Sequence, residues 1–282
     1  MGRQSALGGR AVQPGVEADR GQLGGAAVYW SRGRLTLIRY AHREHGEAAV
    51  RTDTLSDWKR LAALADDYKT SNWIFRGVED EAYELIPRIG RPDASKDLNS
   101  GGDLGYSTDF ETRCIARFKR EARPHMIIEP RSKLDWLSIA QHHGLPTRLL
   151  DWTESPLVAA YFALRAGGSV NKQPKNATIY GLPCPQIVST DEELSAASED
   201  VVAYFPQHLT PRITAQRGLF THHSVPDCAY KPSDAVKWLI PSGMCFTLKV
   251  ILNKCGFNEA SMFPDLVGVA NHVGWLLKWR LL

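Results

Sequence analysis

The segment 134–164 constrains the fold of this chain more than any other part of the sequence. Apolar residues recur at helical spacing over 134–140, and Gly144 ends that predicted helix. Residues 147–150 then predict a short buried strand. The nearly unbroken apolar run 156–164 begins with a proline, which suits the first position of a helix. The segment therefore predicts a helix, a tight turn, a strand, a second turn and a buried helix.

The two turns of this segment carry a dense set of polar and aromatic side chains. They are His142, His143, Thr147, Arg148, Asp151, Trp152, Thr153 and Glu154. Turns that gather such groups between buried helices are common positions for binding and catalytic residues. A purely structural arrangement is equally open at this point, with Arg148 paired to Asp151 and the hydroxyl groups serving as helix caps.

These residues also resemble a known family. The run 142–153, His-His-Gly-Leu-Pro-Thr-Arg-Leu-Leu-Asp-Trp-Thr, is similar to the central motif of the FRG domain. That family is named after a Phe-Arg-Gly signature, and Phe75-Arg76-Gly77 stands upstream of the run. Two further family-like segments, 212–222 and 261–266, follow in the expected order. The resemblance spans roughly residues 55–275.

Composition sets broad limits on the class of protein. The chain has 282 residues, 43% of them hydrophobic and 23% charged, as in an ordinary globular protein. A net charge of +3 neither requires nor excludes nucleic acid as a partner. The five cysteines are scattered without metal-ligand spacing, which predicts reduced thiols in a cytoplasmic protein and no metal site. No apolar run predicts a membrane helix or a signal peptide.

The sequence predicts one domain after an N-terminal extension. Residues 1–50 are expected to be poorly ordered or variable, with a hairpin over 28–40, and residues 51–282 to form the FRG-like domain. Helices are predicted at 55–65, 110–124 and 261–279; strands or extended segments at 72–77, 177–182 and 201–206, with one alternating strand within 239–252. Strands and helices mix without regular alternation. This pattern predicts an α+β fold of mixed, mostly antiparallel sheets flanked by helices.

A second resemblance is more distant. Phe75-Arg76-Gly77 at the end of a strand is similar to the opening motif of the arginine-type ADP-ribosyltransferases. That resemblance implies a split sheet and NAD as the substrate, with Arg76 and Arg148 holding its phosphates. It also implies that Asp151 and Thr153 position the nicotinamide ribose, and that Trp152 or Phe220 stacks on nicotinamide or adenine. Gln216 then occupies the position of a glutamate in that superfamily.

The chemistry of these residue types suits NAD, with one departure. A guanidinium matches phosphate oxygens, and a carboxylate stabilises the positive ribose that forms when nicotinamide leaves. Gln216 cannot act as a general base, because its amide is neutral. The missing group is supplied by Asp151 or Glu154, or by His142 or His143, whose ordinary pKa near 6.5 suits proton transfer.

Three functions follow as alternatives. The first is NAD-dependent ADP-ribosyl transfer to a protein or nucleic-acid acceptor, or NAD hydrolysis, in a toxin or anti-phage effector. The second is a non-catalytic module that binds a nucleotide or nucleic acid through the basic helix 113–123. The third is hydrolysis by His142 or His143 together with Asp151. The first requires Arg76, Asp151 and Gln216 to converge on one cleft.

Overall fold

The computed structural model describes residues 26–31, 34–39, 50–91, 107–126, 129–165, 175–206 and 210–281. The chain divides into two compact units, Met1–Glu47 and Ala48–Leu282. Within the first unit, β1 (Ala26–Ser31) and β2 (Arg34–Arg39) form an antiparallel pair. The hairpin predicted over 28–40 is thus confirmed. Most of the remaining N-terminal residues, which were predicted to be poorly ordered, lie outside the described ones.

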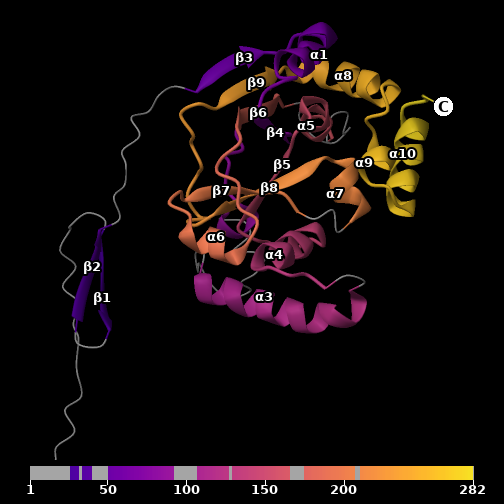
Figure 1. Ribbon diagram of the computed structural model, residues 1–282. Helices are drawn as coiled ribbons and strands as arrows, with labels where there is room; N and C mark the ends of the chain where they lie inside the picture. The colour runs from indigo at the N-terminus through magenta and orange to yellow at the C-terminus, as the bar shows by residue number, and fades with distance from the viewer. Residues whose placement is uncertain are drawn as a thin grey trace, which may run out of the picture. The chain divides into compact units, whose positions relative to one another are not determined.

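A single seven-stranded sheet forms the centre of the second unit (Figure 1). Its strands are β3 (Arg51–Thr54), β4 (Trp73–Val78), β5 (Leu149–Thr153), β6 (Ala177–Pro183), β7 (Val201–Tyr204), β8 (Gly218–His223) and β9 (Val236–Ile240). They lie in the order β3-β9-β6-β4-β5-β8-β7, and all neighbours except β3 and β9 are antiparallel. The predicted mixed, mostly antiparallel α+β fold is confirmed. The predicted split into two sheets is not, because the strands form one continuous sheet.

The centre of this sheet has the least backbone pairing. Between β4 and β5 the only paired residues are Phe75 and Thr153, whereas β4 pairs with β6 at six positions and β5 with β8 at five. The sheet therefore consists of two well-paired groups of strands, β3-β9-β6-β4 and β5-β8-β7. Backbone pairing joins these groups at a single position. Beyond that point, side chains can reach the facing backbone edges of β4 and β5.

The helices of this unit can be followed in Figure 1. Their bounds are α1 (Trp58–Asp67), α3 (Thr108–Ala122), α4 (Lys133–His142), α5 (Pro156–Ala163), α6 (Asp191–Ala196), α7 (Pro211–Ala215), α8 (Ser242–Lys254), α9 (Glu259–Met262) and α10 (Leu266–Lys278). Short 3-10 turns occupy Arg88–Gly90 and Arg123–His125. Asp57 caps α1 and Ser155 caps α5, because their side chains accept hydrogen bonds from the first turn of each helix.

Two hydrophobic clusters lie on the same face of the sheet. Phe75, Ile179 and Trp238 pack against α1, α5 and α8, while Leu149 and Tyr204 pack against α3 and α4. The strand register places these side chains on one face, because residues alternate along a strand and directly paired residues share a face. The two helix groups thus flank the poorly paired centre of the sheet.

Gly77 allows α5 to lie directly on β4. A Cβ atom at this position would lie 1.9 Å from the carbonyl oxygen of Ala159 and 2.5 Å from the amide nitrogen of Ala163. Neither contact is possible for a real side chain. The glycine of the Phe-Arg-Gly signature therefore has a packing role in this fold.

The alternating strand predicted within 239–252 is wrong over most of its length. The strand β9 ends at Ile240, and α8 begins at Ser242. Cys245, Leu248 and Leu252 are the buried residues of α8, and they are spaced three and four residues apart as on one face of a helix. Apolar residues at alternating positions in this run also satisfy the helical period, and packing against the sheet selects the helix.

Candidate functional site

A cavity of about 380 Å³ opens between the two helix groups, within the size range of small-molecule sites. The predicted site residues that line it are Phe75, Arg76, Gly77, His142, Asp151, Trp152, Thr153, Gln216 and Phe220. The convergence of Arg76, Asp151 and Gln216 on one cavity is therefore confirmed. His143 and Arg148 do not line it, nor does Glu154.

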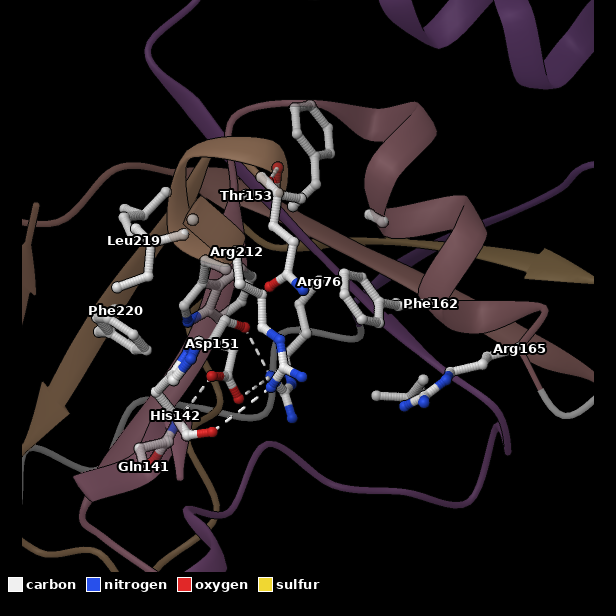
Figure 2. A pocket seen from close by; sticks show the side chains of 18 of the residues that line it. Arg76, Gln141, His142, Asp151, Thr153, Phe162, Arg165, Arg212, Leu219 and Phe220 are labelled. Atoms are coloured by element: carbon white, nitrogen blue, oxygen red, sulfur yellow. Dashed lines mark hydrogen bonds and ion pairs between the residues drawn. The ribbon is translucent and has the colours of Figure 1, made fainter. Parts of the chain in front are cut away.

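Arg76 joins β4 to β5 where their backbone pairing has ended. Its Nη1 atom donates a hydrogen bond to the carbonyl oxygen of Asp151 at 2.6 Å and lies 3.4 Å from the carboxylate Oδ2 of the same residue (Figure 2). Its Nε and Nη2 atoms donate to no other residue in the described part of the chain. The guanidinium thus stabilises the strand contact through one nitrogen and keeps further donors for a ligand.

The carboxylate of Asp151 is held in a fixed orientation. Gln141 Nε2 donates to Asp151 Oδ1 at 2.9 Å, while Arg76 approaches Oδ2. The amide of Gln141 is itself oriented, because its Oε1 accepts a hydrogen bond from the hydroxyl of Thr147. The Asp151 side chain remains 62% exposed. An oriented and accessible carboxyl group therefore faces the cavity.

Gln216 lies at the end of α7, where two hydrogen bonds fix it. The hydroxyl of Thr153 donates to its backbone carbonyl at 2.8 Å, and its own Nε2 donates to the carbonyl oxygen of Met262 at 3.0 Å. The side-chain Oε1 has no hydrogen-bond donor among the residues that the structure describes. Gln216 can thus accept a hydrogen bond from a hydroxyl group in the cavity, but it cannot take up a proton as a base.

Two further arginines line the cavity and were not predicted from the sequence. The guanidinium groups of Arg212 and Arg165 lie over the ring of Phe263, at 4.4 and 4.6 Å from its centroid. Arg212 and Arg76 are both drawn in Figure 2 among the side chains that line the cavity. Among the described residues, the polar contacts of Arg212 are long, at 3.5 Å to the His142 carbonyl and 3.9 Å to Asp265. Arg212 and Phe263 fall in the family-like segments 212–222 and 261–266, which was the available sequence signal.

The two adjacent histidines have different surroundings. His142 lines the cavity, whereas His143 is exposed outside it. Burial, together with the nearby charges of Arg212 and His143, lowers the pKa of His142 to about 4. The imidazole of His142 is therefore neutral at pH 7 and is a poor general base there. Its ordinary pKa near 6.5, on which the predicted proton transfer depended, does not hold in the folded protein.

Arg148 lies apart from the cavity in a buried ion pair. Its Nε is 3.0 Å from both carboxylate oxygens of Glu111, and its Nη2 makes a further short contact with Oε2. The side chains are only 11% and 6% exposed. The predicted pair of Arg148 with Asp151 is wrong, because Glu111 of α3 takes that arginine and Arg76 takes the aspartate. A role for Arg148 in holding phosphate has no geometric support for the same reason.

The aromatic surface of the site also differs from the prediction. Trp152 and Phe220 touch the cavity, but both are buried, and Trp152 Nε1 donates to the hydroxyl of Thr221 at 2.9 Å. Phe162 and Phe263 are only partly buried and line the cavity from α5 and from the segment before α10. These two rings present the more accessible faces for stacking.

Glu79, directly after β4, adds a second carboxylate to the cavity wall. Within the described ranges it makes no hydrogen bond or ion pair. Glu84 also lines the cavity, 4.0 Å from Lys231. Glu79 was not singled out from sequence, since a lone glutamate after a strand has no pattern that distinguishes it from a surface residue.

The basic helix α3 carries its charges in pairs. Within α3, Arg113 is paired with Asp109 and Arg117 with Glu121; Arg123, directly after the helix, is paired with Glu129. All these side chains are exposed, so the arrangement is that of a solvated charged face.

The described residues contain no group of three or more His, Cys, Asp and Glu side chains arranged to hold a metal ion. All five cysteines are free thiols. Among the helices described, none is both long and apolar enough to span a bilayer.

Comparison with known proteins gives one match. No curated protein and no solved structure matches the chain. The family model of the FRG domain matches residues 71–172. This range contains Phe75-Arg76-Gly77 on β4, the run 142–153 through β5, and the helix α5, which together form one side of the cavity. Residues 71–172 are therefore an FRG domain.

Proposed function

We propose that the cavity binds NAD and that the protein breaks the bond between nicotinamide and ribose, passing ADP-ribose to water or to a second molecule. One observation carries the proposal. Arg76, Asp151 and Gln216, which come from three separate strands and turns, line one cavity of about 380 Å³. A cation, a carboxylate and a neutral hydrogen-bond acceptor are the groups needed for the diphosphate, the reacting ribose and its hydroxyls.

The diphosphate is assigned to the basic side of the cavity. Within the described chain Arg76 has unused N–H donors, and Arg212 lines the same cavity with long polar contacts of its own (Figure 2). Planar guanidinium groups bind phosphate oxygens through two parallel hydrogen bonds. Two such groups in one cavity favour a ligand with more than one negative charge. A diphosphate meets this requirement.

The reacting ribose is assigned to the acidic side. When the C1′–N bond breaks, nicotinamide leaves with the bonding electron pair and the ribose becomes positively charged. The oriented carboxylate of Asp151 stabilises this charge, and Gln216 Oε1 accepts a hydrogen bond from a ribose hydroxyl. Water or an acceptor hydroxyl then attacks C1′ and gives up its proton to a carboxylate, for which Asp151 and Glu79 are the candidates.

The test is release of nicotinamide from NAD by the purified protein, followed by chromatography, with labelled NAD to detect transfer. Arg76→Ala and Asp151→Asn should abolish release, whereas Arg117→Glu on the exposed face of α3 should leave it unchanged. Absence of both NAD binding and nicotinamide release in the unmodified protein would contradict the proposal.

A second candidate is a module that binds a nucleotide without turning it over. Two features favour this candidate. Gln216 is neutral, and the carboxylate of Asp151 is paired with Arg76, so neither side chain is a free base. It predicts NAD binding by calorimetry with no release of nicotinamide. Binding of nucleic acid through α3 is less favoured, because the arginines of that helix already have acidic partners.

Cleavage of NAD would suit an anti-phage effector or a toxin acting in the cytoplasm, because loss of NAD stops growth. That biological context rests on analogy. The acceptor, if ADP-ribose is transferred, is a protein or a nucleic acid and would be identified by the labelled product.

A further inference from the structure

A second cavity, of about 240 Å³, is lined by residues of α5, α8, α9 and α10, which can be followed in Figure 1. It is smaller than the usual cavity for a drug-sized ligand, so it suits a small molecule. Among the described residues, Arg165 alone lines both this cavity and the first one. Most of the wall comes from the segment 249–275, which lies outside the matched range 71–172. The second cavity is therefore a separate site, to which the function proposed above assigns no role.

Two cations and one anion line this cavity. Glu259 Oε1 lies 2.7 Å from Nη2 of Arg165, and its Oε2 accepts a hydrogen bond from the hydroxyl of Tyr161. Lys249 brings the second positive charge, and its Nζ donates to the carbonyl oxygen of Arg165 at 2.6 Å. Burial raises the pKa of Tyr161 and lowers the pKa of His272, so both side chains are neutral at pH 7. The titratable side chains of the wall therefore carry a net positive charge.

Burial opposes the charge of Lys249. It lowers the pKa of this ammonium to about 8. The carboxylates of Glu259 and Glu79 act to raise the pKa, whereas Arg165 and Lys278 act to lower it. The surrounding carboxylates thus do not fully compensate for the lost solvent. A bound anion would supply the compensation that they do not.

Aromatic rings form the apolar part of the wall. Phe257 and Trp275 both line the cavity, and Lys249 Nζ lies 5.4 Å from the centroid of the Trp275 ring. The ring of His272 lies nearly parallel to the same indole, at an interplanar angle of 17°. Flat rings pack well against such surfaces. The wall therefore favours a planar ligand with a negative charge at one end.

Two buried polar atoms of lining residues have no hydrogen-bond partner in the described part of the chain. They are Oδ1 of Asn253 in α8 and Nε1 of Trp275 in α10. Leaving a buried acceptor or donor unpaired costs free energy. The surrounding atoms cover both groups, so a ligand reaches them after a rotation of the amide or the indole. A hydroxyl group suits them, because it can both donate and accept a hydrogen bond.

We propose that the second cavity binds a small organic acid, made of one planar ring that carries a carboxylate and a hydroxyl group. The carboxylate is assigned to Lys249 and the ring to the surface of Phe257 and Trp275. A phosphate monoester fits less well, because it brings close to two negative charges to a wall that also holds Glu259. An amine would be repelled by Lys249 and Arg165.

The test is a titration of the full chain with para-(hydroxymethyl)benzoate, followed by NMR of the ligand. The neutral para-(hydroxymethyl)benzamide should bind at least about tenfold more weakly, because it lacks the charge. Lys249→Gln should weaken binding of the acid by about 10- to 100-fold and remove the difference between the two compounds. Lys237→Gln is the matched control and should have no effect. Lys237 also lies over an aromatic ring, 5.0 Å from the centroid of Tyr180, but it lines neither cavity.

A second variant keeps the test valid if Lys249→Gln does not fold. Asn253→Asp preserves the size of the side chain and leaves Lys249 in place, but it adds a negative charge to the wall. It should weaken binding of the acid by at least about tenfold. Circular dichroism checks that each variant is folded.

The pH dependence gives an independent readout. Affinity for the acid should be constant below pH 8 and fall above it, because the free protein then loses the proton of Lys249. Absence of binding by the unmodified protein would overturn the proposal, as would equal affinity for the acid and the amide. Loss of binding in Arg76→Ala but not in Lys249→Gln would also overturn it, since the acid would then occupy the first cavity. None of these outcomes depends on NAD being the ligand of the first cavity.

Discussion

Arg76 and Arg148 stand in two motifs of the same family, and both were predicted to hold a ligand. The structure places one of them at the cavity and the other in a buried ion pair. Arg148 lies in the interior, where Glu111 occupies its guanidinium and both side chains are nearly inaccessible. Arg76 bridges two strands at the edge of a cavity and uses only one nitrogen within the described chain. An arginine in a signature motif is therefore a candidate for ligand binding only when its fold leaves some donors unused.

The largest expected effect is a loss of stability when the buried Arg148 is replaced. Arg148→Ala leaves the carboxylate of Glu111 buried without its partner, so the free energy of unfolding should fall by about 3–5 kcal/mol. Denaturant unfolding followed by circular dichroism measures this change. The double variant Arg148→Met, Glu111→Gln should lose less than the single one, because no full charge then remains buried. Equal losses would show that the ion pair is not the source of the effect.

The cavity arginine should act on binding rather than on stability. Arg76→Ala removes a charged donor, so affinity for NAD should fall by about 10- to 100-fold, equivalent to about 1.5–3 kcal/mol. Arg76→Lys should recover little of this, because an ammonium cannot form two parallel hydrogen bonds. Calorimetric titration measures both variants. Unchanged affinity, in a protein that does bind NAD, would assign Arg76 to the strand contact alone.

Lowering the pH should reduce the free energy of unfolding, even without a ligand. Burial, together with the neighbouring charges of Arg148 and Lys133, lowers the pKa of His222 to about 3. The unfolded chain binds the proton near pH 6.5, so between pH 6.5 and 3 it binds more protons than the folded chain does. Stability is therefore complete above pH 6.5 and falls as the pH drops, by up to about 1.4 kcal/mol per pH unit for this group.

The variant His222→Phe isolates this contribution. Among the residues that the structure describes, neither ring nitrogen of His222 has a hydrogen-bond partner, so an apolar ring of similar shape should be tolerated at neutral pH. The dependence of the unfolding free energy on pH should become shallower between pH 6.5 and 3. An unchanged slope would mean that other groups carry the acid sensitivity.

The smallest effect is expected on α3. Arg117→Glu and Arg120→Glu remove exposed ion pairs with Glu121, each of which contributes about 0.3–0.5 kcal/mol. Stability should change little, and NAD binding should not change. Loss of affinity for a nucleic acid in a filter-binding assay would instead support the alternative function for the basic helix.

Local structure was largely predictable where the sequence marks the ends of its elements. The capped helices α1 and α5, the helix α4 and the strand β4 all agree with prediction, because caps, glycines and prolines act over short distances. The run that became α8 was not predictable by the same means. Its apolar residues fit both strand and helix spacing, and only its contacts with the sheet decide between them.

The site was predictable only as far as the family motifs reached. Their order implied that Arg76, Asp151 and Gln216 would meet, and the cavity confirms it. The partnership of Arg148 with Glu111 depends on how α3 packs, which no short pattern encodes. The lowered pKa of His142 likewise depends on burial, which is a property of the folded chain.

The single paired position between β4 and β5 has a mechanical consequence. The sheet holds together there through Phe75 and Thr153, with Arg76 as an added cross-link. A ligand that contacts Arg76 on one strand and Asp151 on the other would supply the rungs that the backbone lacks. Occupancy and rigidity would then rise together, and amide hydrogens along both strands would exchange more slowly in the bound protein than in the free one.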